Sequence, residues 1–368
     1  METRSKGGSV ADVLRKINLS AQNFTVHQEK TLRALSYCRT SALGGHIDAC
    51  DGCGNLSISY NSCRNRHCPQ CQGHKREEWI QKREQELLPC SYYHVVFTLP
   101  EELNSLAISQ PALLYKTLFE AAWATLNQFG KTEQMQLGMI AILHTWGQNL
   151  SLHPHLHCIV PGGGINKQGK WRAKIKSDKY LFCVKAMSVV FRAKFVALLR
   201  ASGIKDQDLM DKLFTKNWVV YAKRPFGGPK QVIEYLGRYT HKVAISNHRI
   251  KEVTDHEVRF GYKDYRKEGQ KKEMTLSHVE FIRRFSLHIL PRRFVRIRHY
   301  GILSSSWKRG KLQDLQESLK VKRTVFGPQT LLRKCRCCKD GNLFTIALFG
   351  QRGPPQDFLA VLNASSAK

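Results

Sequence analysis

The alternation of apolar and polar residues along the chain predicts a mixture of helices and strands. Apolar residues recur at helical spacing over 10–35, which predicts one or two helices. A charged helix is expected over 75–88, because Pro89 follows it. Further along, strand-like and helix-like stretches alternate, a pattern typical of an α+β sheet domain. The expected strands are 92–99, 135–146, 153–160 and 217–222, with one or two more in 170–184, and the expected helices are 100–129 with a break at Pro111, 186–201 and 231–241.

Two stretches depart from this pattern and suggest three domains. Gly, Asn, Cys and Arg dominate residues 44–75, a composition that suits a small module held together by metal. Residues 249–324 contain 20 Lys and Arg against 9 Asp and Glu, so this region is expected to contact a polyanion. We therefore expect a helical and metal-binding domain at 1–88, a sheet domain at 89–250 and a basic region at 251–368.

The charge of the whole chain narrows its class of partner. Its 59 Lys and Arg exceed its 29 Asp and Glu by 30, which favours a polyanion as the partner. No apolar run approaches the roughly 18 residues of a membrane span, and the N-terminal residues lack the apolar core of a signal peptide. We expect a cytoplasmic protein whose partner is a polyanion rather than a membrane.

Half of the twelve cysteines lie between residues 38 and 71. In a chain without an export signal, such a cluster indicates metal binding rather than disulfides. Two C-x-x-C pairs have the spacing of a zinc ribbon, in which each pair presents two thiolates to one tetrahedral ion. The expected zinc ligands are Cys50, Cys53, Cys68 and Cys71.

Other residues in and beyond this module leave alternatives open. Four of them either form a second zinc site or are ordinary core and surface residues: Cys38, His46, Cys63 and His67. Arg64 and Arg66 lie within the module and are candidates for contacts to DNA phosphates. Near the C-terminus the sequence assigns no role to Cys335, Cys337 and Cys338.

Three histidines alternate along the expected strand 153–160. Alternate residues of a strand point to one face, so His153, His155 and His157 share a face. His155 and His157 can offer two imidazole nitrogens to one divalent ion, whereas Pro154 distorts the strand beside His153. The alternative is that these histidines are solvated or hydrogen-bonded without metal.

Two tyrosines lie four residues apart on the expected helix 231–241. Tyr235 and Tyr239 therefore share one helix face. A tyrosine can attack a phosphodiester and hold the DNA end as a phosphotyrosine. The alternative is structural, because the same residues belong to an apolar stripe that would pack on a sheet.

A run of arginines interleaved with aromatic residues occupies 281–300. It contains no acidic residue, and its arginines are candidates for phosphate contacts: Arg283, Arg284, Arg292, Arg293, Arg296 and Arg298. The aromatic rings of this run, among them Phe281 and Phe285, are candidates for stacking on unpaired bases. The alternative is a solvated basic face over a small core. No Gly-Lys-Ser/Thr follows the glycines at 162–164, so there is no sign of an ATP site.

Several of these motifs, taken in order, resemble a known family. Phe97-Thr98-Leu99, His155-Leu156-His157 and the two tyrosines resemble the three motifs of rolling-circle HUH endonucleases. Within that class, five segments are similar to transposases of the IS91 group: GGHIDACDGCG, SCRNRHCPQCQ, LHTWGQNLSLHPHLHCIVPGGG, YLGRYTHKVAISN and RFSLHILPRRFVRIRHYGIL. The resemblance runs from about Arg33 to about Ser304.

The resemblance implies a central antiparallel sheet and a metal-dependent active site within 89–250. His155 and His157 would hold Mg²⁺ or Mn²⁺. The third ligand in such enzymes is Glu, Gln or His, and we expect Gln148, with His144 as the alternative. One or two structural Zn²⁺ ions would be bound by the N-terminal module.

The resemblance also implies the reaction. Tyr235 and Tyr239 would cut and rejoin single-stranded DNA through 5′-phosphotyrosine intermediates, without ATP, and so drive rolling-circle-like transposition of an insertion sequence. Lys242 would stabilise the developing charge. The DNA partners would be the single-stranded element ends and the target.

Two other functions remain as alternatives. A plasmid replication initiator or relaxase would use the same chemistry, although the zinc module and the arginine-rich region argue against it. A non-catalytic, zinc-dependent DNA-binding protein would use the histidines and tyrosines only for structure.

Overall fold

The computed structural model describes residues 8–173, 181–222, 231–232, 235, 237, 242–321, 333–356 and 358. The chain forms two compact units from segments that alternate along the sequence. The first unit comprises Met1–Glu78, His241–Ile289 and Phe326–Lys368, and the second comprises Trp79–Thr240 and Leu290–Val325. The expected continuous domains, with boundaries near 88 and 250, differ from this division. The reason is long-range strand pairing, which takes one part of the basic region into each unit.

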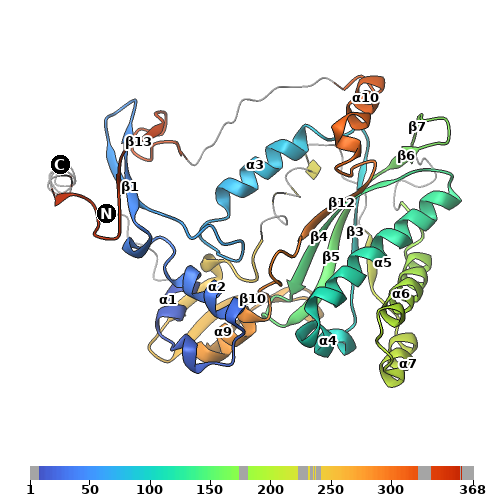
Figure 1. Ribbon diagram of the computed structural model, residues 1–368, viewed down its shortest axis with the longest axis horizontal. Coiled ribbons are helices and arrows are strands. Elements are labelled where there is room, and N and C mark those ends of the chain that lie inside the picture. The colour runs from blue at the N-terminus through green and yellow to red at the C-terminus, as the bar shows by residue number, and fades with distance from the viewer. Residues whose placement is uncertain are drawn as a thin grey trace. The chain divides into compact units, whose positions relative to one another are not determined.

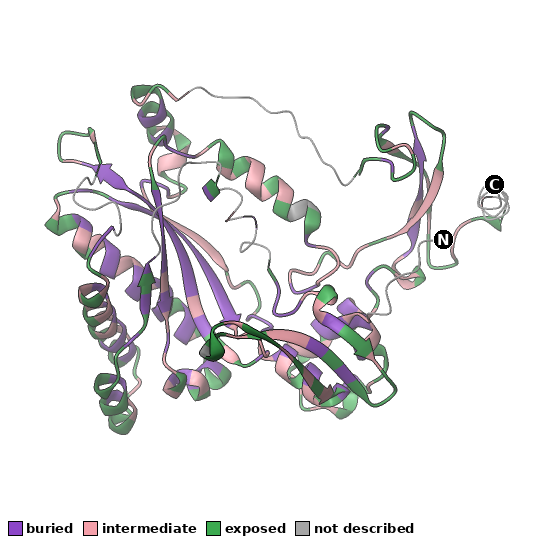
Figure 2. Ribbon diagram, turned by 180° about the vertical axis from the view of Figure 1, so that it is seen from behind, coloured by how far each residue is buried: buried purple, intermediate pink, exposed green. Residues whose placement is uncertain are grey.

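The second unit is built on a five-stranded sheet with the order β12-β4-β5-β3-β8, in which every pairing is antiparallel. Its strands are β3 (Tyr92–Thr98), β4 (Gly138–Trp146), β5 (Leu152–Pro161), β8 (Val220–Ala222) and β12 (Ile297–Gly301). The strands β4 and β5 are buried along most of their length (Figure 2). β6 (Gly163–Ile165) and β7 (Trp171–Ala173) form a separate two-stranded ladder. The predicted α+β fold with a central antiparallel sheet is confirmed.

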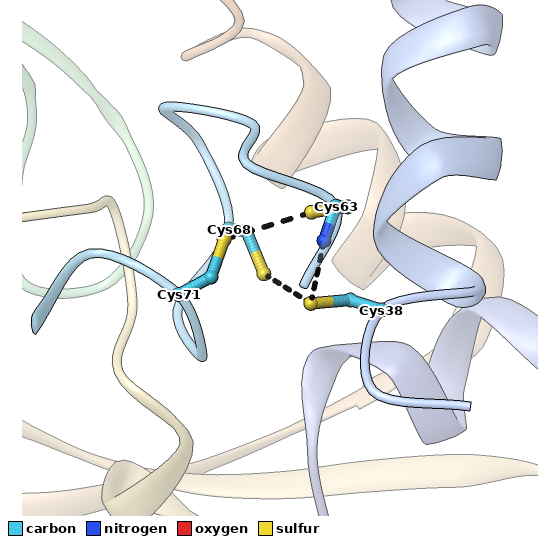
Figure 3. Close-up of side chains that lie close together, drawn as sticks. All are labelled: Cys38, Cys63, Cys68 and Cys71. Atoms are coloured by element: carbon cyan, nitrogen blue, oxygen red, sulfur yellow. Dashed lines mark hydrogen bonds between the residues drawn. The ribbon is translucent and has the colours of Figure 1, made fainter. Parts of the chain in front are cut away.

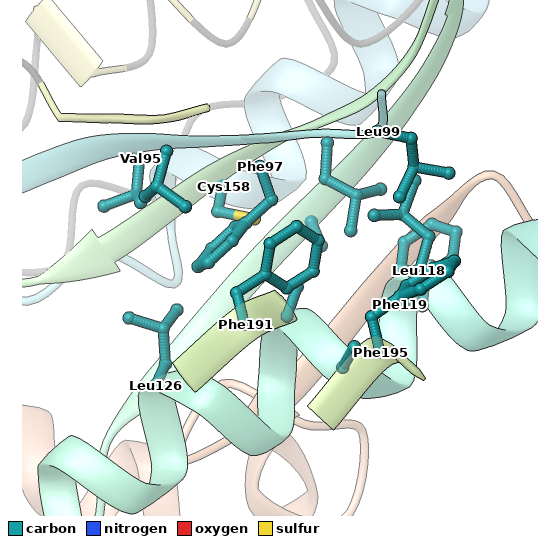
Figure 4. Packing of buried hydrophobic residues seen from close by; sticks show 14 of the residues in the cluster. Val95, Phe97, Leu99, Leu118, Phe119, Leu126, Cys158, Phe191 and Phe195 are labelled. Carbon is teal, nitrogen blue, oxygen red and sulfur yellow. The ribbon is translucent and has the colours of Figure 1, made fainter. Parts of the chain in front are cut away.

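Helices cover one face of this sheet, as Figure 1 shows for α5 and α6. The helices of the second unit are α4 (Asn104–Ser109), α5 (Pro111–Thr132), α6 (Val184–Ala201), α7 (Gln207–Thr215) and α10 (Lys311–Ser318), with 3₁₀ turns η3 (Glu101–Leu103) and η6 (Trp307–Arg309). Pro111 is the first residue of α5, which explains the predicted break in the helical stretch. Phe97 of β3 packs on Phe191 of α6, with ring centroids 4.9 Å apart, and Phe119 of α5 joins the same core (Figure 4). Burying each such side chain contributes about 1.5–3 kcal/mol.

The opposite face of the sheet carries a second core. Because successive strand residues point to opposite faces, Tyr92, Ile140 and Ile159 face away from α5 and α6. They pack with Val232 and with Leu312 of α10. The same alternation places the histidines of β3, β4 and β5 on this second face.

The first unit contains helices and two three-stranded antiparallel sheets. Its helices are α1 (Val10–Arg15), α2 (Val26–Ser36) and α9 (His278–Ser286), and the residues of α3 (Gly73–Glu84) are divided between the two units after Glu78. The sheets have the orders β13-β1-β2 and β11-β10-β9. Their strands are β1 (Gly45–Cys50), β2 (Leu56–Tyr60), β9 (Ile250–Val253), β10 (Glu257–Asp264), β11 (Gln270–Ser277) and β13 (Leu343–Phe349), and the 3₁₀ turns are η1 (Leu19–Ala21), η2 (Ser41–Leu43), η4 (Asn247–Arg249) and η5 (Tyr265–Lys267). β1 therefore lies between one neighbour close in sequence and another about 300 residues away.

Two predicted elements lie partly outside the described residues. Of the expected strands in 170–184, the structure describes β7 and the start of α6. Of the expected helix 231–241, the four described residues, Gln231, Val232, Tyr235 and Gly237, are helical. Among the described helices, none is long and apolar enough to cross a membrane.

Candidate active site and metal centres

Three histidines lie together on the second face of the central sheet. His144 of β4 is the register partner of His155 on β5, and His157 follows two residues later on the same face. One ring nitrogen from each lies within 4.8 Å of the others. Nε2 of His155 is 3.2 Å from Nε2 of His157. We call these three residues the histidine group.

The hydrogen bonds of His155 prepare this group for a cation. Its Nδ1 lies 2.6 Å from the carbonyl oxygen of His153, and because a carbonyl only accepts, Nδ1 donates and Nε2 keeps its lone pair. Two ring nitrogens facing each other at 3.2 Å need a shared proton or cation. A divalent ion bound by imidazoles meets that need, so the residues fit such an ion.

His94 of β3 connects the histidine group to a tyrosine. Its ring is almost completely buried, with Nε2 2.9 Å from Nδ1 of His157. The Tyr235 hydroxyl lies 2.9 Å from Nδ1 of His94 and 3.0 Å from Nε2. One histidine therefore separates a candidate nucleophile from residues suited to bind metal.

Sequence reasoning missed His94, although a signal was present. In the strand YYHVVFT it is the residue whose polar ring falls among apolar neighbours. The register that sets Val96 beside His157 of β5 places His94 on the same face of the sheet. This pairing joins residues about 60 positions apart, which the local pattern does not reveal.

The remaining residues predicted for the active site are not all found beside the histidine group. His144, expected only as the alternative third ligand, is the residue that joins His155 and His157. Gln148 lies in the turn between β4 and β5, and its role stays a prediction. Tyr239 lies outside the described residues. Lys242 is exposed and belongs to the first unit, so its catalytic role also stays a prediction.

The first cysteine cluster consists of Cys38, Cys63, Cys68 and Cys71, whose sulfur atoms all lie within 4.8 Å of one another (Figure 3). The Sγ atoms of Cys38 and Cys68 are 3.4 Å apart, and those of Cys63 and Cys71 are 3.7 Å apart. Zn–S bonds of about 2.3 Å at tetrahedral angles set sulfur atoms about 3.8 Å apart, so the cluster fits zinc. The hydrogen bond between the Cys38 and Cys63 side chains holds the pKa of the Cys38 thiol well below its usual range.

The second cysteine cluster consists of Cys50, Cys53, Cys335 and Cys338, which also lie within 4.8 Å of one another. The backbone N–H of Gly341 donates to Cys338 Sγ at 3.3 Å and is the main reason why the pKa of this thiol falls to about 7.

The predicted grouping of the zinc ligands is therefore corrected. The four expected ligands divide between the two clusters, Cys50 and Cys53 in one, Cys68 and Cys71 in the other. A C-x-x-C pair fixes its own turn but does not select its partner. The pairing of β13 with β1 brings the C-terminal cysteines beside the first pair.

The two histidines proposed for a second zinc site belong to neither cluster. Nε2 of His46 lies 3.3 Å from a carboxylate oxygen of Asp48. His67 is buried and accepts from the Arg66 guanidinium at 3.4 Å. The candidates Cys38 and Cys63 do join a cluster, but with Cys68 and Cys71 as their partners.

The arginine-rich stretch is divided between the two units. Arg283 and Arg284 of α9 both pair with Glu280, and this pairing, chiefly with Arg283, lowers the pKa of that carboxyl to about 2. Phe281 and Phe285 are buried, so their predicted stacking on bases is wrong. In the second unit the Arg298 guanidinium lies over the rings of Phe119 and Phe294. Arg292 and Arg293 are exposed there, and Arg296 is half-buried. Arg64, in the first unit, is also exposed. Phosphate contacts by these arginines stay a prediction.

Two family models match the chain, "Transposase zinc-binding domain" over residues 10–99 and "Putative transposase" over residues 138–311. The chain is 41% identical to the putative transposase y4qJ of Sinorhizobium fredii, over 95% of this chain and 98% of the relative. It is 27% identical to the transposase for insertion sequence element IS801 of Pseudomonas savastanoi pv. phaseolicola, over 79% and 74% of the two chains. No solved structure matches.

Proposed function

Because the chain belongs to the IS91 family of transposases, we propose that it moves an insertion sequence by cutting and rejoining single-stranded DNA through 5′-phosphotyrosine intermediates. The observation that carries this proposal is the hydrogen-bonded path from Tyr235 through His94 to His157. It supports a tyrosine nucleophile held beside residues suited to a divalent cation.

In the proposed reaction the phenolic oxygen of Tyr235 attacks the scissile phosphorus. The bond from phosphorus to the 3′ oxygen breaks, so the 5′ phosphate stays on the tyrosine. The phenol gives up one proton and the leaving 3′ oxygen takes one up, which balances the step without ATP. Attack by another 3′-hydroxyl on the phosphotyrosine reverses the chemistry and joins the DNA end to a new strand.

His94 acts in this scheme as a positioning residue. Its ring contacts the Tyr235 hydroxyl and therefore limits the directions from which the phenol can approach DNA. It also contacts Nδ1 of His157, which leaves Nε2 of that ring for a cation. Partners of this kind set the tautomer and orientation of metal-binding histidines.

His144, His155 and His157 would hold the divalent ion, which polarises the scissile phosphate when bound. Imidazole donors suit Mn²⁺ better than Mg²⁺, because Mg²⁺ prefers oxygen ligands. We therefore propose Mn²⁺ as the preferred ion. Removal of the third ligand by His144→Ala should weaken Mn²⁺ binding more than about tenfold. If Gln148→Ala weakens it more than His144→Ala does, the third ligand is Gln148.

DNA binding would rest on the basic residues and on the zinc-binding module rather than on the histidine group. The net charge of +30 supports contacts to many phosphates, so affinity should fall steeply with salt. His155→Ala and His157→Ala should then abolish cleavage and leave DNA binding nearly unchanged. A large loss of DNA affinity in these variants would contradict this separation.

The decisive experiment is an adduct assay with labelled single-stranded element ends. We expect an SDS-resistant protein–DNA adduct in wild type, reduced adduct in Tyr235→Phe or Tyr239→Phe, and none in the double variant. Phe keeps the ring of Tyr235 against His94, so the change removes the nucleophile without a cavity. Tyr221→Phe is the matched control, because Tyr221 is an exposed tyrosine of the same unit.

The same assay tests the alternative functions. If wild type forms no adduct, or if the double variant forms as much as wild type, the proposed chemistry is wrong and a non-catalytic role is favoured. A replication initiator or relaxase would also form the adduct, so excision and insertion of a marked element must be measured as well. We expect each single tyrosine variant to fail in that complete reaction.

A further inference from the structure

We propose that the second cysteine cluster binds a structural zinc ion that fastens the C-terminal strand β13 to the N-terminal module. The matching family models end at residues 99 and 311, so Cys335 and Cys338 lie outside both. The proposal concerns the first unit alone and does not rest on the cleavage chemistry, whose residues lie in the second unit.

The positions of the sulfur atoms fit a tetrahedral ion. Cys50 Sγ lies 3.6 Å from Cys338 Sγ, and Cys53 Sγ lies 3.8 Å from Cys335 Sγ. These distances match the roughly 3.8 Å expected between thiolates around one Zn²⁺. They are far longer than the roughly 2.05 Å of a disulfide bond. Four thiols at this spacing repel as thiolates unless a cation lies among them.

The backbone of both turns also supports this assignment. Gly52 N–H donates to Cys50 Sγ at 3.4 Å, and Gly341 N–H donates to Cys338 Sγ at 3.3 Å. Both bonds point at sulfur atoms of the cluster and stabilise thiolates, the form that binds zinc. One sulfur atom of each C-x-x-C pair thus accepts a backbone N–H, from Gly52 within the first pair and from Gly341 three residues after the second.

Hydrogen bonds hold the two turns to each other. Asn342 N–H donates to the Asp51 carboxylate at 2.6 Å, and Asp51 N–H donates to the Asn342 carbonyl at 3.1 Å. The strands continue this contact, because Cys50 is the register partner of Leu343. The two turns are therefore arranged like the halves of a zinc ribbon, although 282 residues separate Cys53 from Cys335.

The apolar contacts of β13 are too few to explain this pairing alone. Phe344, Ile346 and Leu348 are 48%, 43% and 79% exposed. Strands with so little buried apolar surface are marginal in water, and metal binding commonly supplies the missing stability of small modules. A zinc ion at the cluster would provide it.

Zinc content of the purified full-length protein tests the proposal. We expect two zinc ions per chain in wild type and one in Cys335→Ser/Cys338→Ser. The matched control Cys337→Ser should keep two, because Cys337 is adjacent but lies outside the cluster. One zinc ion in wild type, or two in the double variant, would overturn the proposal.

Alkylation of wild-type protein under reducing conditions tests it without a variant that might misfold. Cys53 and Cys337 are both exposed, but only Cys53 belongs to the cluster. With zinc bound, Cys337 should react more than about tenfold faster than Cys53, and a chelator should remove most of that difference. Equal rates in the zinc-loaded protein would refute zinc at this cluster, as would protection of Cys53 that persists after the metal is removed.

Discussion

Replacing His94 with Phe should separate two contributions of this residue to the proposed reaction. Phe keeps a ring in a site where the His94 side chain is buried and stacks on His157 at 5.1 Å. It removes the contact to Nδ1 of His157 and the contact to the Tyr235 hydroxyl, both 2.9 Å long. These two contacts affect different steps, metal binding and orientation of the nucleophile.

The expected magnitudes follow from the type of each contact. Loss of the partner of a metal-binding histidine typically lowers metal affinity about 10- to 100-fold, or about 1.4–2.8 kcal/mol. Loss of one neutral hydrogen bond to Tyr235 costs about 0.5–1.5 kcal/mol, or about 2- to 12-fold in rate. Saturating Mn²⁺ should therefore restore most of the activity of His94→Phe. Only the smaller loss in rate, caused by the missing hydrogen bond to Tyr235, should remain.

The assay measures initial rates of adduct formation while Mn²⁺ is titrated, together with the Mn²⁺ dissociation constant. His94→Gln is the matched variant, since its amide can still donate and accept, and it should recover part of the loss. Thermal unfolding and DNA affinity should match wild type in both variants. If His94→Phe binds Mn²⁺ with wild-type affinity and cleaves at the wild-type rate, the positioning role is refuted.

Three further predictions concern stability and the second cluster. Burial, together with the charges of Lys308 and Arg83, lowers the pKa of His299 to about 3. In the unfolded chain the same ring takes up a proton below about pH 6.5. The free energy of unfolding should therefore fall by about 2 kcal/mol from neutral pH to pH 5 on account of this histidine. In urea unfolding, the free energy of unfolding should fall less between pH 7 and pH 5 for His299→Gln than for wild type or for His256→Gln, a control at an exposed histidine. An equal fall in all three proteins would contradict the role given to His299. Gly341→Ala places a Cβ against a sulfur atom of the second cluster, so zinc content should fall and stability should drop by about 1–3 kcal/mol, whereas Gly350→Ala, which meets open space, should behave as wild type. Phe191→Ala should cost about 3–5 kcal/mol in thermal or urea unfolding, and a cost below 1 kcal/mol would show that the core refills the space.

The central sheet was largely predictable because its strands carry strong local signals. The runs that form β3, β4 and β5 are apolar and flanked by turn residues, so their positions follow from the sequence. Their order does not. β12 lies beside β4, and β8 beside β3, through contacts between segments far apart in the chain. Pairing between distant segments also explains the units. The local pattern predicts domains that are continuous in sequence, whereas the structure forms each unit from separate segments.

The site residues were predictable where chemistry and spacing coincide. His155 and His157 are two residues apart on one strand, so alternation alone brings them together. His144 joins them through the register of β4 on β5, and His94 through the register of β3, which local spacing does not encode. The cysteines show the same limit, since Cys50 and Cys53 pair with residues at the other end of the chain.

The pairing of β1 with β13 has a consequence for how the protein is made. During translation β1 leaves the ribosome about 290 residues before β13, a delay of roughly 15–60 s at ordinary rates of synthesis. For that time one edge of β1 lacks its neighbour and is open to pairing with other nascent chains. A copy of the gene that is cut short between the codons for β12 and β13 would still encode the central sheet and its histidines. The sheet β13-β1-β2 would then lack β13. The sheet β13-β1-β2 is therefore completed only by a segment about 290 residues downstream of β1.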